Sequence, residues 1–415
     1  MSEAKQNDAV GNGKPNGKPT VLSHGMGLDA VPPSWPALTL DEVARLLRHY
    51  PQVGTVTRLN WHSPRPFSSA CVADTESGPV FVKRLLQQIR TADELMEEHR
   101  FMAHLRQHGL AVSEVLRTSD GNTAHADGNW TYELQRLGQG VDRYRDATSW
   151  TPFVSTADAA AAGSALARLH LAARGYDAPA RSTKLLASGF TLFNTENPQE
   201  VIKRTGRYIQ ERPALADYLA RRDWQQEMSR VLLPFHARLS PCLHGLAPLW
   251  THNDWHASNL LWQAQGVNQA RSAVTTVVDF GLADRTCAVY DLAIAIERNL
   301  IEWLALPSTP VDQRALVHID QLDAMLDAYE AIRPLSALEA AALPALLPVA
   351  HAEFALSELA YFHGVQKSAE NSALAYDTYF LGHAEWFNSD AGQYLLDHLQ
   401  RRSNCSNRKI HQQES

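Results

Sequence analysis

The segment His252-Asn253-Asp254-Trp255-His256-Ala257-Ser258-Asn259 decides how this 415-residue chain is interpreted. Asp254 and Asn259 are close enough in the chain for a loop to point both side chains into one cleft. Transfer of a phosphoryl group requires a carboxylate beside the attacking hydroxyl and oxygen ligands for the cations on the phosphates. Asp254 is therefore predicted to orient the hydroxyl or accept its proton, and Asn259 to bind Mg²⁺.

A second short motif follows a predicted hairpin. Residues 260–262 and 274–278 are apolar runs on either side of a polar loop, which predicts two antiparallel strands. Asp279-Phe280-Gly281 comes directly after them, where Asp279 can supply a second oxygen ligand for Mg²⁺. Each motif alone arises by chance, but the two in this order predict the active site of a kinase.

The rest of the chain divides into a β-rich and a helix-rich part. Short strand-like runs lie at 55–57, 69–72, 79–83, 112–116 and 130–134, and a capping-box-like Thr91-Ala92-Asp93-Glu94 begins a helix that ends near Gly109. Ala- and Leu-rich predicted helices follow at 159–170, 213–222, 312–331 and 335–364. The pattern predicts an α+β, bilobal fold: a small antiparallel N-terminal lobe with one helix and a larger, mainly helical C-terminal lobe.

Lys83 is the candidate for holding the nucleotide phosphates. It ends an apolar strand, from which an ammonium group can reach the α- and β-phosphates. Glu98, on the predicted helix, can pair with Lys83 and fix its position, and Glu97 is the competing residue. Glu98 is favoured because it lies on the apolar face of the helix, which is expected to pack on the sheet.

These motifs resemble the aminoglycoside phosphotransferase and choline kinase family, which has a protein-kinase-like fold. His256 stands two positions after Asp254, as in the family's His-x-Asp-x-His-x-x-Asn loop, where protein kinases usually carry Lys. Leu166-Ala167-Arg168-Leu169-His170 is similar to the family's Leu-Ala-x-Leu-His helix, and Tyr290-Asp291-Leu292-Ala293 follows the Asp-Phe-Gly motif as it does there. The resemblance covers about residues 53–386.

The resemblance implies ATP as the phosphate donor, Mg²⁺ as the cofactor and a small-molecule hydroxyl as the acceptor. The acceptor class includes amino alcohols, aminoglycosides and sugar-like compounds. It also implies that Asp291 braces the catalytic loop. The family's junction between the lobes falls at 132–135, where backbone groups of Glu133 and Gln135 are expected to bind adenine.

One segment departs from the kinase pattern. The first hairpin, 60–69, lacks the glycines whose backbone amides cover the phosphates in protein kinases. Ser68 and Ser69 are expected either to donate hydrogen bonds to phosphate in their place or only to form the turn.

Carboxylate and aromatic side chains of the helical lobe suit an acceptor that carries a cationic amine. The candidates are Asp284, Glu297, Trp303, Glu353, Glu358 and Tyr361. Trp255, beside Asp254, is expected either to form one wall of the acceptor site or to pack under the loop.

Charge, cysteine content and apolar pattern indicate which partners, compartment and membrane association to expect. A formal net charge of −7 gives no basic surplus for nucleic acid. The four cysteines lie far apart, which fits neither a zinc framework nor a disulfide scaffold and favours the cytoplasm. The most apolar run, 337–361, is interrupted by Pro344, Pro348 and charged residues, so buried helices are expected there rather than a membrane span.

The expected organisation is a disordered leader at 1–35, a nucleotide-binding lobe at 36–137, a catalytic and substrate lobe at 138–400 and a flexible tail at 401–415. Three other functions compete with the small-molecule kinase. They are a metallohydrolase with zinc on His252, Asp254 and His256, a protein Ser/Thr kinase, and a nucleotide-binding module without turnover. The metallohydrolase leaves Lys83 and Asn259 without a role, and the missing Gly-rich loop disfavours a protein kinase.

Overall fold

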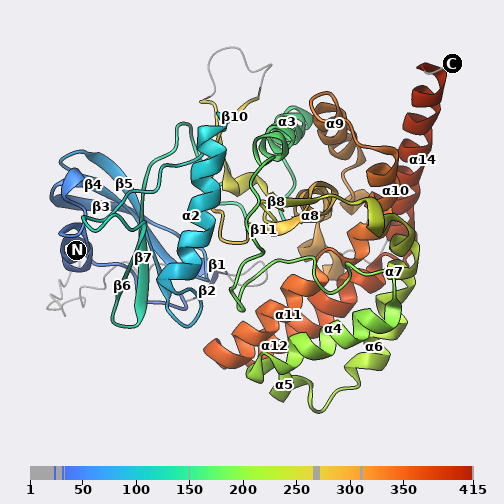
Figure 1. The fold of residues 1–415 in the computed structure, drawn as a ribbon, viewed down its shortest axis with the longest axis horizontal. Helices are drawn as coiled ribbons and strands as arrows, with labels where there is room; N and C mark the ends of the chain where they lie inside the picture. The colour runs from blue at the N-terminus through green and yellow to red at the C-terminus, as the bar shows by residue number, and fades with distance from the viewer. Residues whose placement is uncertain are drawn as a thin grey trace, which may run out of the picture.

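The computed structural model describes residues 23–24, 30–31, 33–148, 150–264, 272–308 and 312–413. Most of the expected leader lies outside these residues. The chain forms two lobes joined by a linker at 137–141, with the sheet at one side of the molecule and the helical lobe at the other (Figure 1). This is the bilobal α+β arrangement that the sequence predicts.

A five-stranded antiparallel sheet forms the N-terminal lobe. Its strand order is β3 (Val56–His62), β4 (Ser69–Thr75), β5 (Gly78–Leu86), β7 (Trp130–Arg136), β6 (Ala124–Asp127). Val80, Val82 and Leu134 are fully buried on one face, where they pack with Val43 and Leu47 of α1 (Leu40–Leu47). Burial of these β-branched and aliphatic side chains accounts for the choice of strand at 79–83.

Helix α2 (Ala92–Gln107) lies between the sheet and the helical lobe (Figure 1). It begins with the predicted capping box, in which Glu94 N donates to Thr91 Oγ1 at 3.3 Å and Thr91 N donates to Glu94 Oε2 at 2.8 Å. Its buried residues include Phe101 and Met102, which join the core of the helical lobe. The helix thus packs its C-terminal half into the core of the helical lobe, while Leu95 nearer its start lies in a separate small cluster with Leu85 of β5.

The expected strand at 112–116 is replaced by isolated bridges. Val112 pairs with Val277, whereas Val115 pairs with Gln135. The segment crosses from one lobe to the other, so it cannot follow a single strand along its length. The fifth strand of the sheet is instead β6, which the sequence did not predict.

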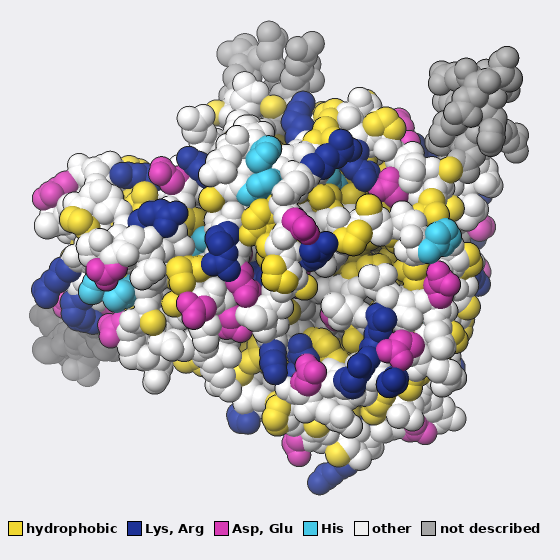
Figure 2. Space-filling model, viewed as in Figure 1, with side chains coloured by type: hydrophobic (Ala, Val, Ile, Leu, Met, Phe, Trp, Pro, Cys, Tyr) yellow, Lys and Arg dark blue, Asp and Glu magenta, His cyan; other side chains and the backbone are white. Residues whose placement is uncertain are grey.

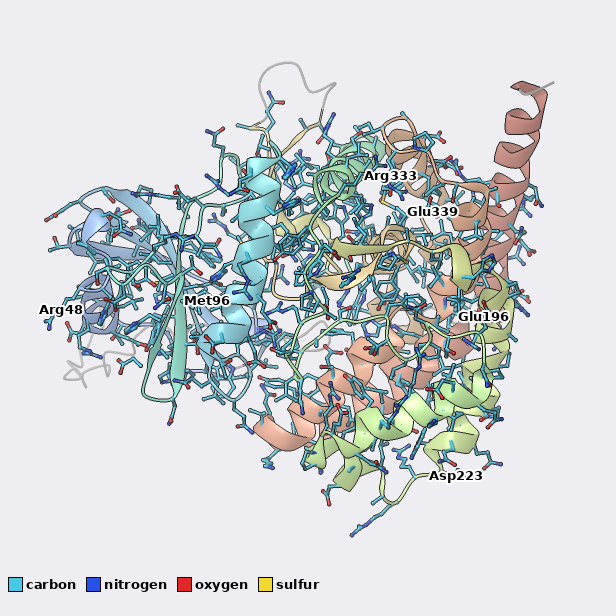
Figure 3. All side chains as sticks on the ribbon, in the orientation of Figure 1. Arg48, Met96, Glu196, Asp223, Arg333 and Glu339 are labelled. Carbon is cyan, nitrogen blue, oxygen red and sulfur yellow. The ribbon has the colours of Figure 1, made fainter. Side chains whose placement is uncertain are left out.

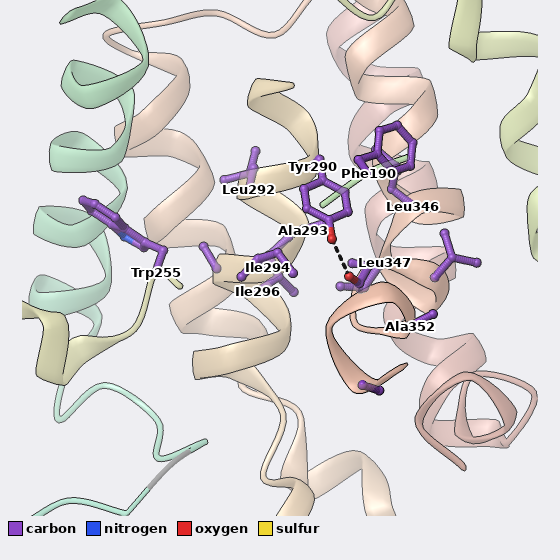
Figure 4. Packing of buried hydrophobic residues seen from close by; sticks show 14 of the residues in the cluster. Phe190, Trp255, Tyr290, Leu292, Ala293, Ile294, Ile296, Leu346, Leu347 and Ala352 are labelled. Carbon is purple, nitrogen blue, oxygen red and sulfur yellow. Dashed lines mark hydrogen bonds between the residues drawn. The ribbon is translucent and has the colours of Figure 1, made fainter. Parts of the chain in front are cut away.

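The helical lobe is built around α8 (Ala288–Leu300), in which every residue is buried. Tyr290 stacks on Phe190 with ring centroids 5.0 Å apart and donates a hydrogen bond to the Ala350 carbonyl at 2.7 Å (Figure 4). The surrounding helices are α3 (Thr156–Ala172), α4 (Pro198–Gln210), α5 (Pro213–Leu219), α6 (Trp224–Val231), α7 (Leu233–Leu239), α9 (Ile319–Glu330), α10 (Ala337–Leu346), α11 (Ala352–Tyr361), α12 (Ala369–Ala373), α13 (His383–Trp386) and α14 (Asp390–Gln413).

The apolar run that includes α10 and α11 is internal. Over Ala337–Gln366 the mean hydropathy reaches 1.3, and 89% of the most apolar window is buried in the fold. A second capping box, between Ser336 and Glu339, starts this run, and Arg333 pairs with Glu339 at 2.6 Å (Figure 3). The run thus packs as core helices, as its prolines predict.

Two short antiparallel pairs hold the loops of interest. The predicted hairpin is present as β9 (Leu260–Trp262) and β10 (Val274–Val277). A second pair, β8 (Pro248–Thr251) with β11 (Asp284–Cys287), was not predicted. Its strands are only four residues long and far apart in the chain, so neither shows a clear alternating pattern.

The C-terminal end differs from the expected flexible tail. Helix α14 continues through residue 401 to Gln413. Arg402 anchors it, with ion pairs to Asp323 at 3.0 Å, Asp327 at 2.7 Å and Glu330 at 3.2 Å. On the face that Figure 2 shows, Lys and Arg side chains are interspersed with Asp and Glu side chains.

Candidate active site

Two adjoining cavities lie between the lobes. The first, of about 250 Å³, extends from the sheet to the linker, and the second, of about 160 Å³, extends into the helical lobe. Arg65, Lys83, Asn259 and Asp279 line both. The residues predicted to bind the phosphates and Mg²⁺ therefore lie where a phosphoryl group could pass from one cavity to the other.

The loop that carries Asp254 is fixed from below by Asp291. The Asp291 carboxylate accepts hydrogen bonds from the backbone N–H of His252 at 2.9 Å and of Asn253 at 2.8 Å. His170 Nε2 lies 3.0 Å from the same carboxylate. Asn253 adopts a left-handed backbone conformation with φ of 59°, which these bonds stabilise. Asp291 thus braces the loop, as the resemblance implied.

Asp254 lines the second cavity, with Arg298 and His256 beside its carboxylate. Its carboxylate is 3.6 Å from Arg298 Nη2 and 3.5 Å from His256 Nε2, and Asn259 Nδ2 donates to it at 3.1 Å. Burial alone would raise the pKa of Asp254, but His256 and Arg298 outweigh it and hold the pKa below its ordinary value. Asp254 is thus an ionised carboxylate.

Asn259 and Asp279 offer oxygen atoms of the kind that Mg²⁺ prefers. The Asn259 amide nitrogen donates to Asp254, which leaves its amide oxygen for another partner. Asp279 follows β10 in a left-handed conformation, with φ of 58°, and its side chain is 43% exposed to the cleft. A carboxylate and an amide oxygen with room for water fit Mg²⁺ coordination.

Lys83 forms an ion pair with a residue of the helical lobe. Its Nζ lies 2.9 Å from Asp279 Oδ1 and 3.9 Å from Glu133 Oε1. Burial lowers the pKa of the Lys83 ammonium, but Asp279 and Glu133 more than compensate and raise it above the ordinary value. The expected partner, Glu98, instead pairs with Arg181 at 2.9 Å. Arg181 comes from a loop of the helical lobe, and no local pattern predicts that it lies there.

The adenine-binding expectation is corrected by the sheet register. Glu133 and Gln135 lie inside β7, paired with Lys83 and Phe81 of β5, so their backbone groups belong to the sheet. The Glu133 carboxylate binds His99, with Oε2 2.8 Å from Nε2. The linker that follows β7 lines the first cavity instead. The cavity's other apolar walls are Trp61, Val72, Phe81, Leu137 and Leu261.

The two serines of the first hairpin differ in position. Ser69 donates to the Pro36 carbonyl at 2.8 Å and is buried in β4, so its hydroxyl is directed away from the phosphate region. Ser68 lines the second cavity. Only Ser68 therefore remains placed to contact a ligand.

Some of the residues predicted for the acceptor site line the second cavity, and others do not. Glu358 lines the second cavity, but Trp255 packs beneath the loop, edge-on to His252 with ring centroids 5.5 Å apart. Asp284 is turned toward the backbone N–H of Arg181, at 2.8 Å. Trp255 and Asp284 thus have structural positions, which is the second of the two roles considered for Trp255.

Glu297 lies behind the wall of the second cavity and contacts two of the residues that form it. Its carboxylate accepts from Trp150 Nε1 at 3.2 Å and lies 3.7 Å from Arg298 Nε. Arg298 in turn stacks over Trp150 and Phe354, with its guanidinium carbon 5.5 and 5.3 Å from the ring centroids. Trp150, Arg298 and Phe354 line the second cavity, and the sequence analysis missed all three.

The histidines of the loop are engaged within the protein. His252 Nε2 lies 3.1 Å from the Val278 carbonyl oxygen, and His256 Nδ1 lies 2.8 Å from Ser258 Oγ. These contacts hold the loop and use ring nitrogens that a zinc site would need. The geometry favours the kinase over the metallohydrolase.

The fold and this site define a small-molecule kinase, an ATP-dependent phosphotransferase whose acceptor is a hydroxyl group. The chain belongs to the phosphotransferase enzyme family that includes the aminoglycoside phosphotransferases, whose model matches residues 67–335. The match covers well over half of the chain and confirms the family that the motifs resemble.

Comparisons with individual proteins agree with this placement. A homoserine kinase of Methylocella silvestris is 27% identical over 329 residues, which are 79% of this chain and 88% of that protein. A homoserine kinase of Nitrobacter winogradskyi is 25% identical over the same share of this chain and 86% of its own.

Solved structures show the same fold. A microcompartment-associated aminopropanol kinase aligns with a TM-score of 0.55 at 18% identity, covering 85% of this chain and 99% of that one. An amicoumacin kinase, hAmiN, aligns with a TM-score of 0.50 at 15% identity, covering 82% and 92%. They confirm the bilobal kinase fold.

Proposed function

We propose that the protein phosphorylates the hydroxyl group of a small amino acid or amino alcohol, with ATP and Mg²⁺ in the first cavity and the acceptor in the second. The observation that carries this proposal is that the Arg298 guanidinium and the Glu358 carboxyl group line the same cavity as Asp254. Homoserine has a carboxylate, an ammonium and a hydroxyl, and it is the substrate named for the two relatives.

The size and walls of the second cavity favour a compact acceptor. Its volume of about 160 Å³ is below the usual range of about 300–1,000 Å³ for drug-sized ligands. Trp150 and Phe354 can cover the methylene groups of an acceptor, and Ser68 can bind a polar atom. An aminoglycoside, with several linked rings, fits these dimensions less well.

Charge complementarity supports the orientation of the acceptor. Arg298 offers a planar, permanently charged group for a carboxylate. Glu358 is buried among Arg298, Glu297 and Asp254, and this environment raises its pKa to about 8, burial being the largest cause. An ammonium group beside Glu358 would restore its charged form and supply the missing cation.

The reaction follows from the position of Asp254. The acceptor oxygen attacks the γ-phosphorus, its proton passes to an Asp254 carboxylate oxygen, and the bond from phosphorus to the β,γ-bridging oxygen breaks. The electron pair of that bond leaves on ADP. Because the pKa of Asp254 is low, the carboxylate mainly orients the hydroxyl until the new bond to phosphorus acidifies it.

The remaining residues hold the donor. Asn259 and Asp279 would hold Mg²⁺, which supplies positive charge to the phosphates. Lys83 is placed to bind the α- and β-phosphates from the sheet, where it already contacts Asp279. The apolar walls formed by Val72, Phe81 and Leu261 suit the adenine ring.

Release of ADP from ATP should be measured with homoserine, 1-amino-2-propanol, choline, glucose and kanamycin as acceptors. We expect the highest kcat/KM with homoserine or the amino alcohol and none above background with kanamycin. The same panel on Asp254→Asn checks that turnover arises from this site. Highest activity on the aminoglycoside, or on a protein substrate, would contradict the proposal.

A further inference from the structure

The hairpin between β3 and β4 has no glycine to bring backbone amides to the phosphates, and its prolines remove two such amides. Residues 63–68 read Ser-Pro-Arg-Pro-Phe-Ser. Pro64 and Pro66 lack an N–H and fix φ near −65°, so they restrict the backbone on both sides of Arg65. The hairpin therefore offers fewer backbone donors to a phosphate, and a side chain could supply the cover instead.

Arg65 extends from this hairpin across the cleft to the helical lobe. Its Nη2 donates to Ser258 Oγ at 2.7 Å, and the Ala147 carbonyl oxygen lies 3.4 Å from the same nitrogen. Ser258 Oγ in turn lies 2.8 Å from Nδ1 of His256, the residue beside Asp254. Arg65 thus contacts the catalytic loop directly, although it belongs to the other lobe.

The surroundings of Arg65 are those of a phosphate-binding group. It lines both the nucleotide and the acceptor cavities. Asp254, Asp142 and Asp279 are the charged groups that favour its cationic form against the cost of burial. Two of these carboxylates are the proposed base and the proposed Mg²⁺ ligand, so the guanidinium lies beside the path between donor and acceptor.

We infer that Arg65 is a catalytic residue that contacts the γ-phosphoryl group as it moves from the nucleotide to the acceptor. This inference rests on the proposed function and adds a group to it. A guanidinium offers several N–H donors in one plane, which suits the equatorial oxygens of a transferring phosphoryl group. It would take the place of the missing glycine-rich cover, with Ser258 holding it when the site is empty.

The test compares nucleotide states that differ only at the γ-position. Binding of ADP and of ADP with aluminium fluoride, an analogue of the transferring phosphoryl group, is measured by calorimetry in the presence of Mg²⁺. For Arg65→Ala we expect affinity for the fluoride complex to fall roughly 30- to 100-fold, whereas affinity for ADP changes by less than about threefold. Arg65→Lys, which keeps the charge but loses the planar donor set, should lie between the two.

Turnover provides the second readout. With the best acceptor, Arg65→Ala should lower kcat roughly 10²- to 10³-fold with little change in the KM for ATP, and added guanidinium chloride should restore part of the rate. Arg58→Ala is the matched control because Arg58 is in the same hairpin, is 72% exposed and pairs with Asp74. This variant should behave as wild type, and thermal unfolding of all variants checks that they fold.

Two results would overturn the inference. One is an Arg65→Ala variant that binds the fluoride complex as tightly as wild type. The other is an equal loss of affinity for ADP and for the fluoride complex, which would assign Arg65 to nucleotide retention instead. If no acceptor supports turnover, the proposed acceptor class fails, but the binding comparison still decides the role of Arg65, because it contains no acceptor.

Discussion

Arg298 places its Nη2 3.6 Å from Oδ1 of Asp254, so a permanent cation stands beside the proposed base in the acceptor cavity. Replacement by Leu should raise the KM for homoserine roughly 10- to 100-fold, because an ionic hydrogen bond to the carboxylate is lost. The KM for 1-amino-2-propanol, which has no carboxylate, should change much less. Steady-state kinetics with both acceptors test this, and equal losses for both would argue against carboxylate recognition.

Asp254→Asn should separate chemistry from binding. The amide keeps the shape of the side chain but cannot accept the proton, so kcat should fall at least about 10³-fold. Binding of ATP should stay within about threefold of wild type, because Lys83, Asn259 and Asp279 remain. Single-turnover kinetics and calorimetry measure the two quantities. Full activity of this variant would remove Asp254 from the mechanism.

The acceptor site should become more effective as the pH rises toward 8. Glu358, with a pKa of about 8, is protonated in the free enzyme at lower pH, whereas an ammonium acceptor binds the ionised form. The kcat/KM for homoserine should therefore rise by up to about tenfold per pH unit below this value and level off above it. In Glu358→Gln the rise should disappear and the KM should be high throughout. A profile unchanged by the substitution would show that another group titrates.

Asp291→Ala should destabilise the protein as well as inactivate it. It removes the acceptor of two buried backbone N–H groups, at His252 and Asn253, and the partner of His170. Each unsatisfied buried donor costs about 1–3 kcal/mol, so the free energy of unfolding should fall by at least about 2 kcal/mol. Urea denaturation measures the change. Glu339→Ala, which removes a partly exposed partner of Arg333, should cost less.

Two glycine-to-alanine substitutions in helices should have opposite effects on stability. In α3, a Cβ on Gly163 would lie 2.1 Å from the Met325 carbonyl oxygen of α9, so Gly163→Ala should destabilise by about 1–3 kcal/mol. In α4, a Cβ on Gly206 would meet only Trp224, at 3.8 Å, so Gly206→Ala should stabilise by roughly 0.5–1 kcal/mol through helix propensity. Thermal unfolding of both variants tests whether α3 and α9 pack as closely as described.

Local patterns in the sequence were sufficient for the elements that form the proposed active site. The strand at Lys83, the capped start of α2 and the hairpin before Asp279 each depend on neighbouring residues, and the structure confirms them. The proposed catalytic loop could be predicted because Asp254 and Asn259 belong to one short motif. Features of this kind are encoded over short stretches of chain.

Contacts between distant segments were not predictable in the same way. Arg65 and Arg298 reach the site from opposite lobes and belong to no motif, and Glu98 pairs with Arg181 rather than with Lys83. One signal was available: Arg298 is a charged residue near the end of a helix in which most of the other residues are apolar. A charge buried in such a helix requires a partner, which makes Arg298 a candidate for the proposed site.

The lobe boundary illustrates a different limit. The family resemblance placed the adenine contacts at Glu133 and Gln135. Strand β7 extends through Arg136, however, and uses their backbone groups. Element boundaries are the least certain part of any prediction from local pattern, and a shift of a few residues moves the contact to the linker.

The linker at 137–141 is bonded to the helical lobe along its length. The Gln139 carbonyl accepts from Thr275 and Thr276 at 2.6 and 2.8 Å, and Val141 exchanges two backbone hydrogen bonds with Trp262. Inside the cleft, two side-chain contacts also connect the lobes, in the pairs Lys83–Asp279 and Arg65–Ser258. We therefore expect nucleotide exchange to require separation of Lys83 from Asp279 and of Arg65 from Ser258, while the backbone contacts of Gln139 and Val141 are kept. Because the contact between Lys83 and Asp279 is an ion pair, the rate of nucleotide exchange should depend on the salt concentration.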